Sequence, residues 1–130
     1  MATIFTKIIK GEIPCYKIAE NDRYFAFLDI NPLKIGHTLV VPKIEKDYIF
    51  DLDDATLSGL HLFAKSVALA LRKAIPCQRI GVAVLGMEVP HAHIHLVPMN
   101  SMGDVNFANP KLKLSTEEMT AIAASIRAAQ

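Results

Sequence analysis

The sequence contains little cysteine and no excess of charge of either sign. Its two cysteines, Cys15 and Cys77, are far apart and form no CxxC pair, so free thiols are expected rather than a disulfide or a thiolate metal site. Fourteen basic and thirteen acidic residues leave a formal net charge of +1, which provides no basic surface for nucleic acid or for an anionic membrane. Any phosphate that the protein binds must therefore be held by local contacts.

Long hydrophobic runs are absent as well. No apolar run reaches the length of a membrane span, and residues 1–7 lack the apolar core of a signal peptide. We therefore predict a cytoplasmic protein that binds neither membranes nor nucleic acid. The 130 residues, 52% of them hydrophobic, fit one domain over 1–130. We place its core at about residues 3–98, followed by a loop and a C-terminal helix at 99–130.

Hydrophobic periodicity and turn residues predict a mixed fold of helices and strands. An opening helix covers 3–10, and strands cover 15–20, 24–28, 37–42, 79–85 and 91–98. The short connection between the last two strands favours an antiparallel pair. A long helix begins at Asp53 or Asp54 and reaches Ala74 or Ile75, and a capping box at 115–118 begins a final helix.

The long helix is apolar on more than one side. Leu62, Phe63, Leu69 and Ala70 lie largely outside its main apolar stripe, so the helix must bury a second side. Either another subunit or a single well-covered core would provide the cover. The loop at 99–114 is long enough to need a reason, such as crossing the site or a partner.

The histidine row, His91, His93 and His95, is the strongest functional signal. In an extended strand these three side chains point to one face, while Ala92 and Ile94 point to the other. A purely structural row is disfavoured, because histidine is only an intermediate residue for burial and a buried imidazole needs partners for both ring nitrogens. The row therefore indicates either a metal site or a nucleophile with proton-transfer groups.

The metal hypothesis is the weaker of the two. The row spans roughly 13 Å of strand, so its outer members cannot easily share one ion. A zinc site would need two of them plus ligands from elsewhere, and no pattern links His61 on the long helix or Asp29 on a turn to the row. A nucleophile needs less: an imidazole attacks phosphorus near neutral pH, and neighbouring imidazoles can fix its tautomer and stabilise charge on the phosphate oxygens.

Two other polar residues stand at strand ends. Asp29 follows the strand 24–28 and is either an ordinary turn aspartate or a carboxylate that accepts hydrogen bonds from the vicinal hydroxyls of a sugar. His37 opens the strand 37–42 and is either a strand-end residue or a second functional imidazole. These alternatives stay open on the local pattern alone.

Several segments together resemble the histidine triad family, in particular its nucleotide-binding, phosphoramidase-like branch. Residues 91–97 (HAHIHLV) match the family's His-x-His-x-His-x-x motif. Residues 4–14 (IFTKIIKGEIP), 26–32 (AFLDINP) and 36–43 (GHTLVVPK) are similar to its opening helix and turn, its ribose-contacting turn and its third strand. These segments follow the family's order through about residue 98 and are together far more specific than the row alone.

The resemblance implies an α+β fold in which a long helix packs on a five-stranded antiparallel sheet, and two subunits join in a homodimer with a continuous ten-stranded sheet. It implies that His93 attacks the α-phosphate of a nucleotide, that His95 contacts the phosphate, and that His91 and His37 support the site. Asp29 would bind the ribose hydroxyls. The residues that would form the base pocket are Ile4, Phe5, Ile8, Phe27, Ile30 and Leu39.

Two departures from the family pattern bear on the chemistry. The stretch before the histidine row is shorter than usual, and Glu88 falls where a Ser or Thr usually contacts the phosphate or the leaving group. Glu88 is then a general acid for the leaving group or a structural substitute. Some relatives hold zinc with CxxC in the opening helix and a later histidine; here those positions are Thr3, Thr6 and Glu45, so we expect no metal and no other cofactor.

We therefore predict a hydrolase or transferase that acts on adenosine or guanosine 5′-phosphoramidates, or on related nucleoside phosphates, through a nucleotidyl intermediate on His93. One alternative keeps the fold but not the turnover, as a nucleotide-binding or partner-binding module. Another is a metal-dependent hydrolase that uses the histidine row.

Overall fold

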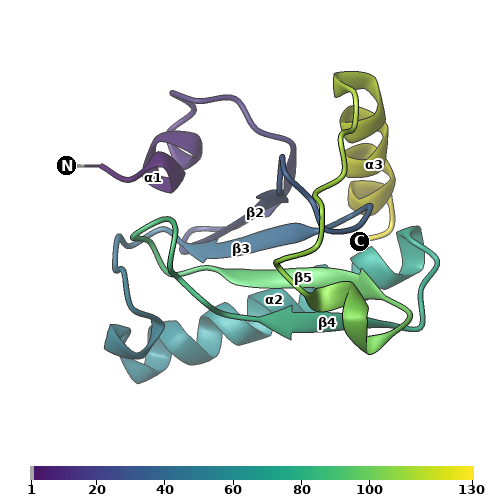
Figure 1. The fold of residues 1–130 in the computed structure, drawn as a ribbon. Coiled ribbons are helices and arrows are strands. Elements are labelled where there is room, and N and C mark those ends of the chain that lie inside the picture. Colours follow the sequence, from purple (N-terminus) through teal and green to yellow (C-terminus); the bar gives the residue numbers. More distant parts are fainter. Residues whose placement is uncertain (1) are drawn as a thin grey trace.

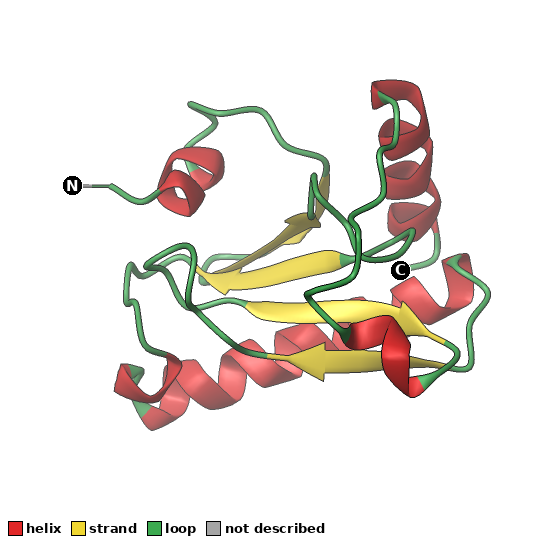
Figure 2. Ribbon diagram, viewed as in Figure 1, coloured by secondary structure: helices red, strands yellow, loops and turns green. Residues whose placement is uncertain are grey.

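The computed structural model describes residues 2–130, which form a five-stranded antiparallel sheet flanked by helices (Figures 1 and 2). The strand order is β1-β2-β3-β5-β4. The elements are α1 (Ile4–Ile9), β1 (Lys17–Glu20), β2 (Tyr24–Leu28), β3 (Thr38–Pro42), η1 (Ile49–Asp51), α2 (Asp54–Ala74), β4 (Arg79–Ala83), β5 (Ile94–Met99), η2 (Met102–Val105) and α3 (Thr116–Ala128), where η marks a 3₁₀ helix. The predicted α+β class, the antiparallel sheet and the long helix are confirmed.

One face of the sheet, the core face, buries the main hydrophobic core. Side chains alternate along a strand, so Tyr24, Ala26 and Leu28 of β2 point to this face together with Ile94 and Leu96 of β5. Figure 1 shows α2 running along this side. Residues of α2 and α3 complete the core; the buried ones are Leu60, Ala64, Val67, Ala70, Leu71, Met119, Ala123 and Ile126.

The opposite face, the site face, is covered by the short helix α1 and by loops. Phe5 of α1 packs against a second buried cluster that includes Phe25, Phe27 and Leu39. The rings of Phe5 and Phe27 meet edge to face with centroids 5.4 Å apart, a favoured aromatic geometry. No long helix lies over this face among residues 2–130, so room remains for a pocket between α1 and the ends of β2, β3 and β5.

The helix termini follow the predicted capping. The Asp53 carboxylate accepts a hydrogen bond from the Thr56 N–H at 2.7 Å and caps α2. In α3, Ser115 Oγ accepts from the Glu118 N–H at 3.1 Å, and Glu118 Oε1 accepts from the Ser115 N–H at 2.9 Å. The predicted start of the long helix and the predicted capping box are thus confirmed.

The histidine row departs from the prediction in one respect. We expected a strand over 91–98, but β5 begins at Ile94, because the backbone before it is bonded to loops instead of to a strand. The His91 N–H donates to Val89 O at 2.8 Å, and the Ala92 N–H donates to Lys46 O at 2.7 Å. Ala92 nevertheless lies in the core with Ile94, so the expected alternation of side chains persists. The predicted antiparallel pairing of β4 and β5 is confirmed.

The second apolar side of α2 is only partly covered. Ala70 is buried, and Phe63 stacks on Tyr24 with ring centroids 5.7 Å apart. Leu62 and Leu69 remain 68% and 58% exposed. The neighbouring strand β4 is an edge of the sheet. None of the described helices combines the length and the hydropathy needed to span a membrane.

Candidate active site

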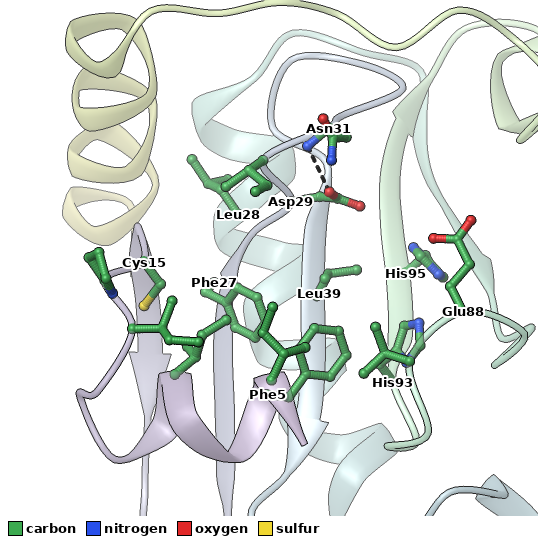
Figure 3. Close-up of a pocket in the computed structure, with 16 residues that line it drawn as sticks. Phe5, Cys15, Phe27, Leu28, Asp29, Asn31, Leu39, Glu88, His93 and His95 are labelled. Carbon is green, nitrogen blue, oxygen red and sulfur yellow. Dashed lines mark hydrogen bonds between the residues drawn. The ribbon is translucent and has the colours of Figure 1, made fainter. Parts of the chain in front are cut away.

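A cavity of about 240 Å³, the first cavity, lies on the site face between α1 and the ends of β2, β3 and β5 (Figure 3). Strand register explains its position, since Phe27 pairs with Leu39 and Leu39 pairs with His95. Cross-strand partners point to the same face, so an apolar wall adjoins the histidine row. All seven residues predicted to bind a nucleotide line this cavity: Ile4, Phe5, Ile8, Phe27, Asp29, Ile30 and Leu39.

Asp29 lies at the end of β2, where its carboxylate faces the cavity (Figure 3). Its Oδ1 accepts a hydrogen bond from the Asn31 N–H at 2.9 Å, which holds the turn. Burial raises the pKa of the Asp29 carboxyl above its usual value, although the Asn31 N–H opposes this shift. Asp29 Oδ2 lies 3.6 Å from His37 Nε2, which ties this turn to the histidines.

The partners of His37 and His95 determine which ring nitrogens carry protons. The Leu33 N–H donates to His37 Nδ1 at 3.0 Å, so His37 Nδ1 is the bare nitrogen and Nε2 carries the proton. His37 Nε2 lies 3.0 Å from His95 Nδ1 and donates to it. His95 Nδ1 is therefore an acceptor, and His95 Nε2–H is left as a donor. His95 lines the first cavity, where such a donor suits a phosphate oxygen.

The same reasoning assigns the tautomers of His91 and His93. His91 Nε2 lies 2.8 Å from Pro42 O, and a carbonyl only accepts, so Nε2 carries the proton. His93 Nδ1 donates to His91 O at 2.7 Å. His93 Nε2 then has a free lone pair, which is the form of imidazole that attacks an electrophile. His93 lines the cavity and His91 does not.

Burial keeps the supporting imidazoles neutral. Desolvation, with smaller contributions from neighbouring charged groups, lowers the pKa of His37 to about 4 and that of His95 to about 3. The pKa of His91 is also lowered, chiefly by burial. The tautomers assigned to His37, His91 and His95 are those of neutral rings, so they hold across the physiological pH range.

Asp29, His37 and His95 bring their donor atoms within 4.8 Å of one another, as a metal site would. The sequence showed no link between Asp29 and the row; the structure overturns this, because His37 stands between them. Two nitrogens on one tetrahedral zinc stand about 3.3 Å apart, given Zn–N bonds of about 2.0–2.1 Å. The 3.0 Å separation of His37 Nε2 and His95 Nδ1 fits a hydrogen bond better than a shared ion.

The three residues at the positions of zinc ligands in some relatives form a network that we call the Thr3 clamp: Thr3, Thr6 and Glu45. Glu45 Oε1 accepts from the Thr3 N–H at 2.7 Å and from the Thr6 hydroxyl at 2.6 Å. The Thr3 hydroxyl donates to His91 Nδ1 at 2.8 Å. These hydrogen bonds lower the pKa of the Glu45 carboxyl. Hydroxyl groups are poor zinc ligands, which supports the expectation of a metal-free site.

A second cavity of about 220 Å³ adjoins the first and is lined by His37, His95 and Glu88, among others. Glu88 lines both cavities and is exposed (Figure 3). Phe107 and Lys111 line the second cavity from the loop 99–114, and neither was among the predicted site residues. The available signal was the unexplained length of the loop 99–114, which crosses the site.

The HIT domain family matches residues 10–102 of this chain, a stretch that includes the histidine row. The chain belongs to the HIT family. The adenosine 5′-monophosphoramidase of Schizosaccharomyces pombe is 34% identical to this HIT protein over 97% of the chain and 96% of its own length. A HIT-like protein of Bartonella henselae superposes with a TM-score of 0.86 at 32% identity, covering 98% of this chain and 96% of that one.

A zinc-bound HIT protein of Mycobacterium smegmatis is also similar, with a TM-score of 0.84 and 26% identity over 99% of this chain and 93% of that one. This HIT protein has the Thr3 clamp at the positions discussed above. HIT proteins similar to this chain thus include a named phosphoramidase and a zinc-bound protein.

Proposed function

We propose that this HIT protein hydrolyses purine nucleoside 5′-phosphoramidates, or related nucleoside phosphates, at the α-phosphate through a nucleotidyl intermediate on His93. One observation carries the proposal: His93 Nδ1 is bonded to His91 O at 2.7 Å, so its Nε2 has a free lone pair beside the cavity. The adenosine 5′-monophosphoramidase of S. pombe, similar over nearly its whole length, supports the substrate class.

The nucleoside occupies the first cavity in this proposal. Phe5, Phe27 and Leu39 supply an apolar wall for the base, while Asp29 accepts hydrogen bonds from the ribose hydroxyls. The α-phosphate then reaches His93 and His95. The Nε2–H of His95 donates to a non-bridging oxygen, and its neutral partner His37 fixes that orientation. His91 supports His93 from behind through its carbonyl.

The reaction proceeds in two displacements. His93 Nε2 attacks the phosphorus, and the bond from phosphorus to the leaving nitrogen breaks as the bond to Nε2 forms. The leaving nitrogen takes a proton from the Glu88 carboxyl, which acts here as the general acid. Water then attacks phosphorus, its proton passes to Glu88, and the bond to Nε2 breaks, which releases the nucleoside monophosphate.

The first experiment compares wild type with His93→Ala on adenosine 5′-phosphoramidate, with a chelator present throughout. We expect turnover by wild type, loss of turnover in the variant, and a nucleotidyl adduct on His93 in wild type quenched with alkaline denaturant, in which the nitrogen–phosphorus bond survives. An active wild type without an adduct would overturn the intermediate. An inactive wild type that still binds adenosine monophosphate would favour a nucleotide-binding module, and loss of activity with chelator would favour a metal-dependent hydrolase.

The role of Glu88 is tested separately. If Glu88 protonates the leaving group, Glu88→Gln slows phosphoramidate turnover and removes the alkaline limb of the pH profile, which is the fall in rate as the general acid loses its proton. Because Gln keeps the size of the side chain, an unchanged rate and an unchanged pH profile would restrict Glu88 to a structural role. Glu117→Gln provides the matched control, because Glu117 is exposed on α3 and lines neither cavity, so it should leave the profile intact.

We also propose that two copies pair as a homodimer along β4. This edge strand has Val82 61% exposed, and the uncovered side chains of Leu62 and Leu69 belong to the helix that packs beside it. Unpaired edges with apolar neighbours favour association. Sedimentation should give twice the mass of the chain for wild type, and Val82→Glu should shift it toward the monomer. A monomeric wild type at micromolar concentration would overturn the dimer.

A further inference from the structure

The two cavities share the residues that would surround a reacting phosphate. Asp29, Asn31, Glu88, His93 and His95 line both of them. The first cavity is otherwise apolar, apart from a cysteine. A nucleotide that fills it with its phosphate at His93 must project its leaving group outside it. The second cavity, of about 220 Å³, is the adjoining space.

The loop 99–114 forms one wall of the second cavity and is held in place by specific contacts. The Asp104 carboxylate accepts from the Asn100 N–H at 2.8 Å and forms an ion pair of 3.2 Å with Lys34. Further along, the Leu112 N–H donates to Pro32 O at 2.8 Å. These contacts bind both ends of the wall to the body of the domain, so the wall is part of the folded structure.

Phe107 and Lys111 are the two side chains that this wall turns toward the site. The Phe107 ring meets the His95 ring edge to face, with centroids 4.7 Å apart. The Lys111 ammonium donates to Phe107 O at 2.5 Å and to Asn109 O at 3.0 Å. An ammonium has three N–H donors, so one remains for a ligand.

Lys111 is also distinctive in its charge. It is the only lysine or arginine among the lining residues of the two cavities. None of the ion pairs found among residues 2–130 includes it, and none joins it to Glu88 across the cavity. Its charge nevertheless reaches the site, since after burial it contributes to the lowered pKa of His37 and opposes the rise that burial causes in the pKa of Asp29. A fixed cation without an anionic partner favours an anionic ligand.

We infer that the second cavity is a leaving-group subsite in which Lys111 binds an oxyanion carried by the leaving group. The inference rests on the proposed function, because it assumes that the nucleoside lies in the first cavity. Glu88, on the other side, stays available to the leaving nitrogen. The subsite then selects substrates whose leaving group bears a carboxylate or a sulfate over neutral or cationic ones. Lys111 acts on specificity and not on the bond-breaking step itself.

The test compares leaving groups of different charge and reach. Unsubstituted adenosine 5′-phosphoramidate releases ammonia, which is too small to reach Lys111. The N-(2-carboxyethyl) phosphoramidate and its neutral N-(2-carbamoylethyl) isostere differ only in charge. In adenosine 5′-phosphosulfate the oxyanion is directly next to the α-phosphate. Comparing it with the carboxylate substrate therefore shows which separation between oxyanion and α-phosphate the subsite accepts. For wild type we expect kcat/KM to favour the carboxylate over its amide by about tenfold, the typical effect of one charge-assisted hydrogen bond.

Variants in the loop 99–114 then show whether Lys111 causes the preference for the carboxylate. Lys111→Met should reduce the carboxylate-to-amide ratio to about one, and Lys111→Arg should keep most of it. Lys113→Met is the matched control, because Lys113 is exposed, belongs to the same loop and lines neither cavity; its ratio should equal that of wild type. Turnover of the unsubstituted phosphoramidate by Lys111→Met shows that the site is intact.

The outcomes separate the two proposals. If wild type cleaves the unsubstituted substrate but shows no preference for the carboxylate or the sulfate, the subsite is wrong and the proposed function stands. If Lys111→Met lowers kcat/KM equally for all four substrates, Lys111 serves the α-phosphate and the subsite is again wrong. If wild type cleaves none of them, the proposed function itself fails.

Discussion

The two faces of the sheet place adjacent residues of one strand in opposite roles. On the core face, Ile94 and Leu96 are fully buried among apolar side chains of α2 and α3. On the site face, His93 and His95 are nearly as well buried, with 5% and 8% exposure, but each nitrogen that faces the protein has a hydrogen-bond partner. A buried side chain is therefore not always a core side chain. Apolar packing on the core face stabilises the fold, whereas hydrogen bonds on the site face fix the tautomers of the histidines.

The largest expected effects come from substituting Ile94 and His93, neighbouring residues that lie on opposite faces of the sheet. Ile94→Ala should lower the free energy of unfolding by about 2–5 kcal/mol, because it leaves a cavity in a closed core. His93→Ala should change the free energy of unfolding by less than about 1 kcal/mol, the net value of one hydrogen bond, yet reduce phosphoramidate turnover by about 10³-fold or more. Urea unfolding and steady-state kinetics on both variants provide the measurements. If Ile94→Ala lost activity while remaining fully stable, the division between the faces would be wrong.

Lowering the pH should destabilise the folded protein through the buried histidines of the site face. His37 and His95 are neutral in the fold, with pKa values of about 4 and about 3, whereas in the unfolded chain they take protons at about pH 6.5. Between these values the unfolded state binds more protons, so the free energy of unfolding must fall as pH drops from about 6.5 to about 4, by roughly 3 kcal/mol for His37.

Denaturant unfolding at several pH values measures this slope. His37→Asn removes one titrating ring that faces Asp29, His95 and Lys111, and it should flatten the dependence between pH 4 and pH 6.5. His61→Asn is the matched control, since His61 lies exposed on α2 and should leave the slope unchanged. Equal slopes in wild type and His37→Asn would show that His37 is not buried as a neutral ring.

A tight contact on the core face gives a smaller effect. A Cβ at Gly59 would lie 2.0 Å from the Tyr24 hydroxyl, which donates to Thr56 O at 3.0 Å. Gly59→Ala should therefore cost about 1–3 kcal/mol of unfolding free energy, as overpacking does, without changing KM for the nucleotide. Gly103→Ala, where a Cβ meets no atom within 4 Å, is the control. A more stable Gly59→Ala variant would mean that Tyr24 can move aside at no cost.

The sequence predicted the core face and its helices well because the rules that govern them are local. Alternation along β5 separates Ile94 from His95, and the cap at Asp53 defines the start of α2 without knowledge of any distant residue. The resemblance to the HIT family added the apolar wall of the first cavity, since Phe5 and Leu39 lie in matching segments.

The rest of the site depends on contacts between segments far apart in the chain. The link from Asp29 through His37 to His95 needs the pairing of three strands, which no local pattern shows. The strand of the histidine row was predicted to begin at His91. It begins at Ile94 instead, because the backbone N–H groups before it donate to Val89 O and to the loop after β3. Lys111 belongs to a loop whose sequence contains no recognisable motif, and only folding places it beside the row.

The smallest effect concerns the Thr3 clamp, which the sequence showed only as residues that replace the zinc ligands of some relatives. The Thr3 hydroxyl joins α1, which bears Phe5, to His91, which supports His93. Thr3→Val should leave His91 Nδ1 without a donor at a cost of about 1 kcal/mol, and the loosened α1 should raise KM for adenosine 5′-phosphoramidate several-fold while kcat changes less.

Thr3→Ser restores the hydroxyl and should recover the KM of wild type, whereas a purely steric role for Thr3 would give the opposite order, because Val matches the shape of Thr better than Ser does. A KM that follows the hydroxyl would show that hydrogen bonds hold α1 in place on the site face, as apolar packing holds α2 on the core face. A KM that follows the shape would mean that α1 is held as α2 is, and that the two faces differ only in the histidines they present.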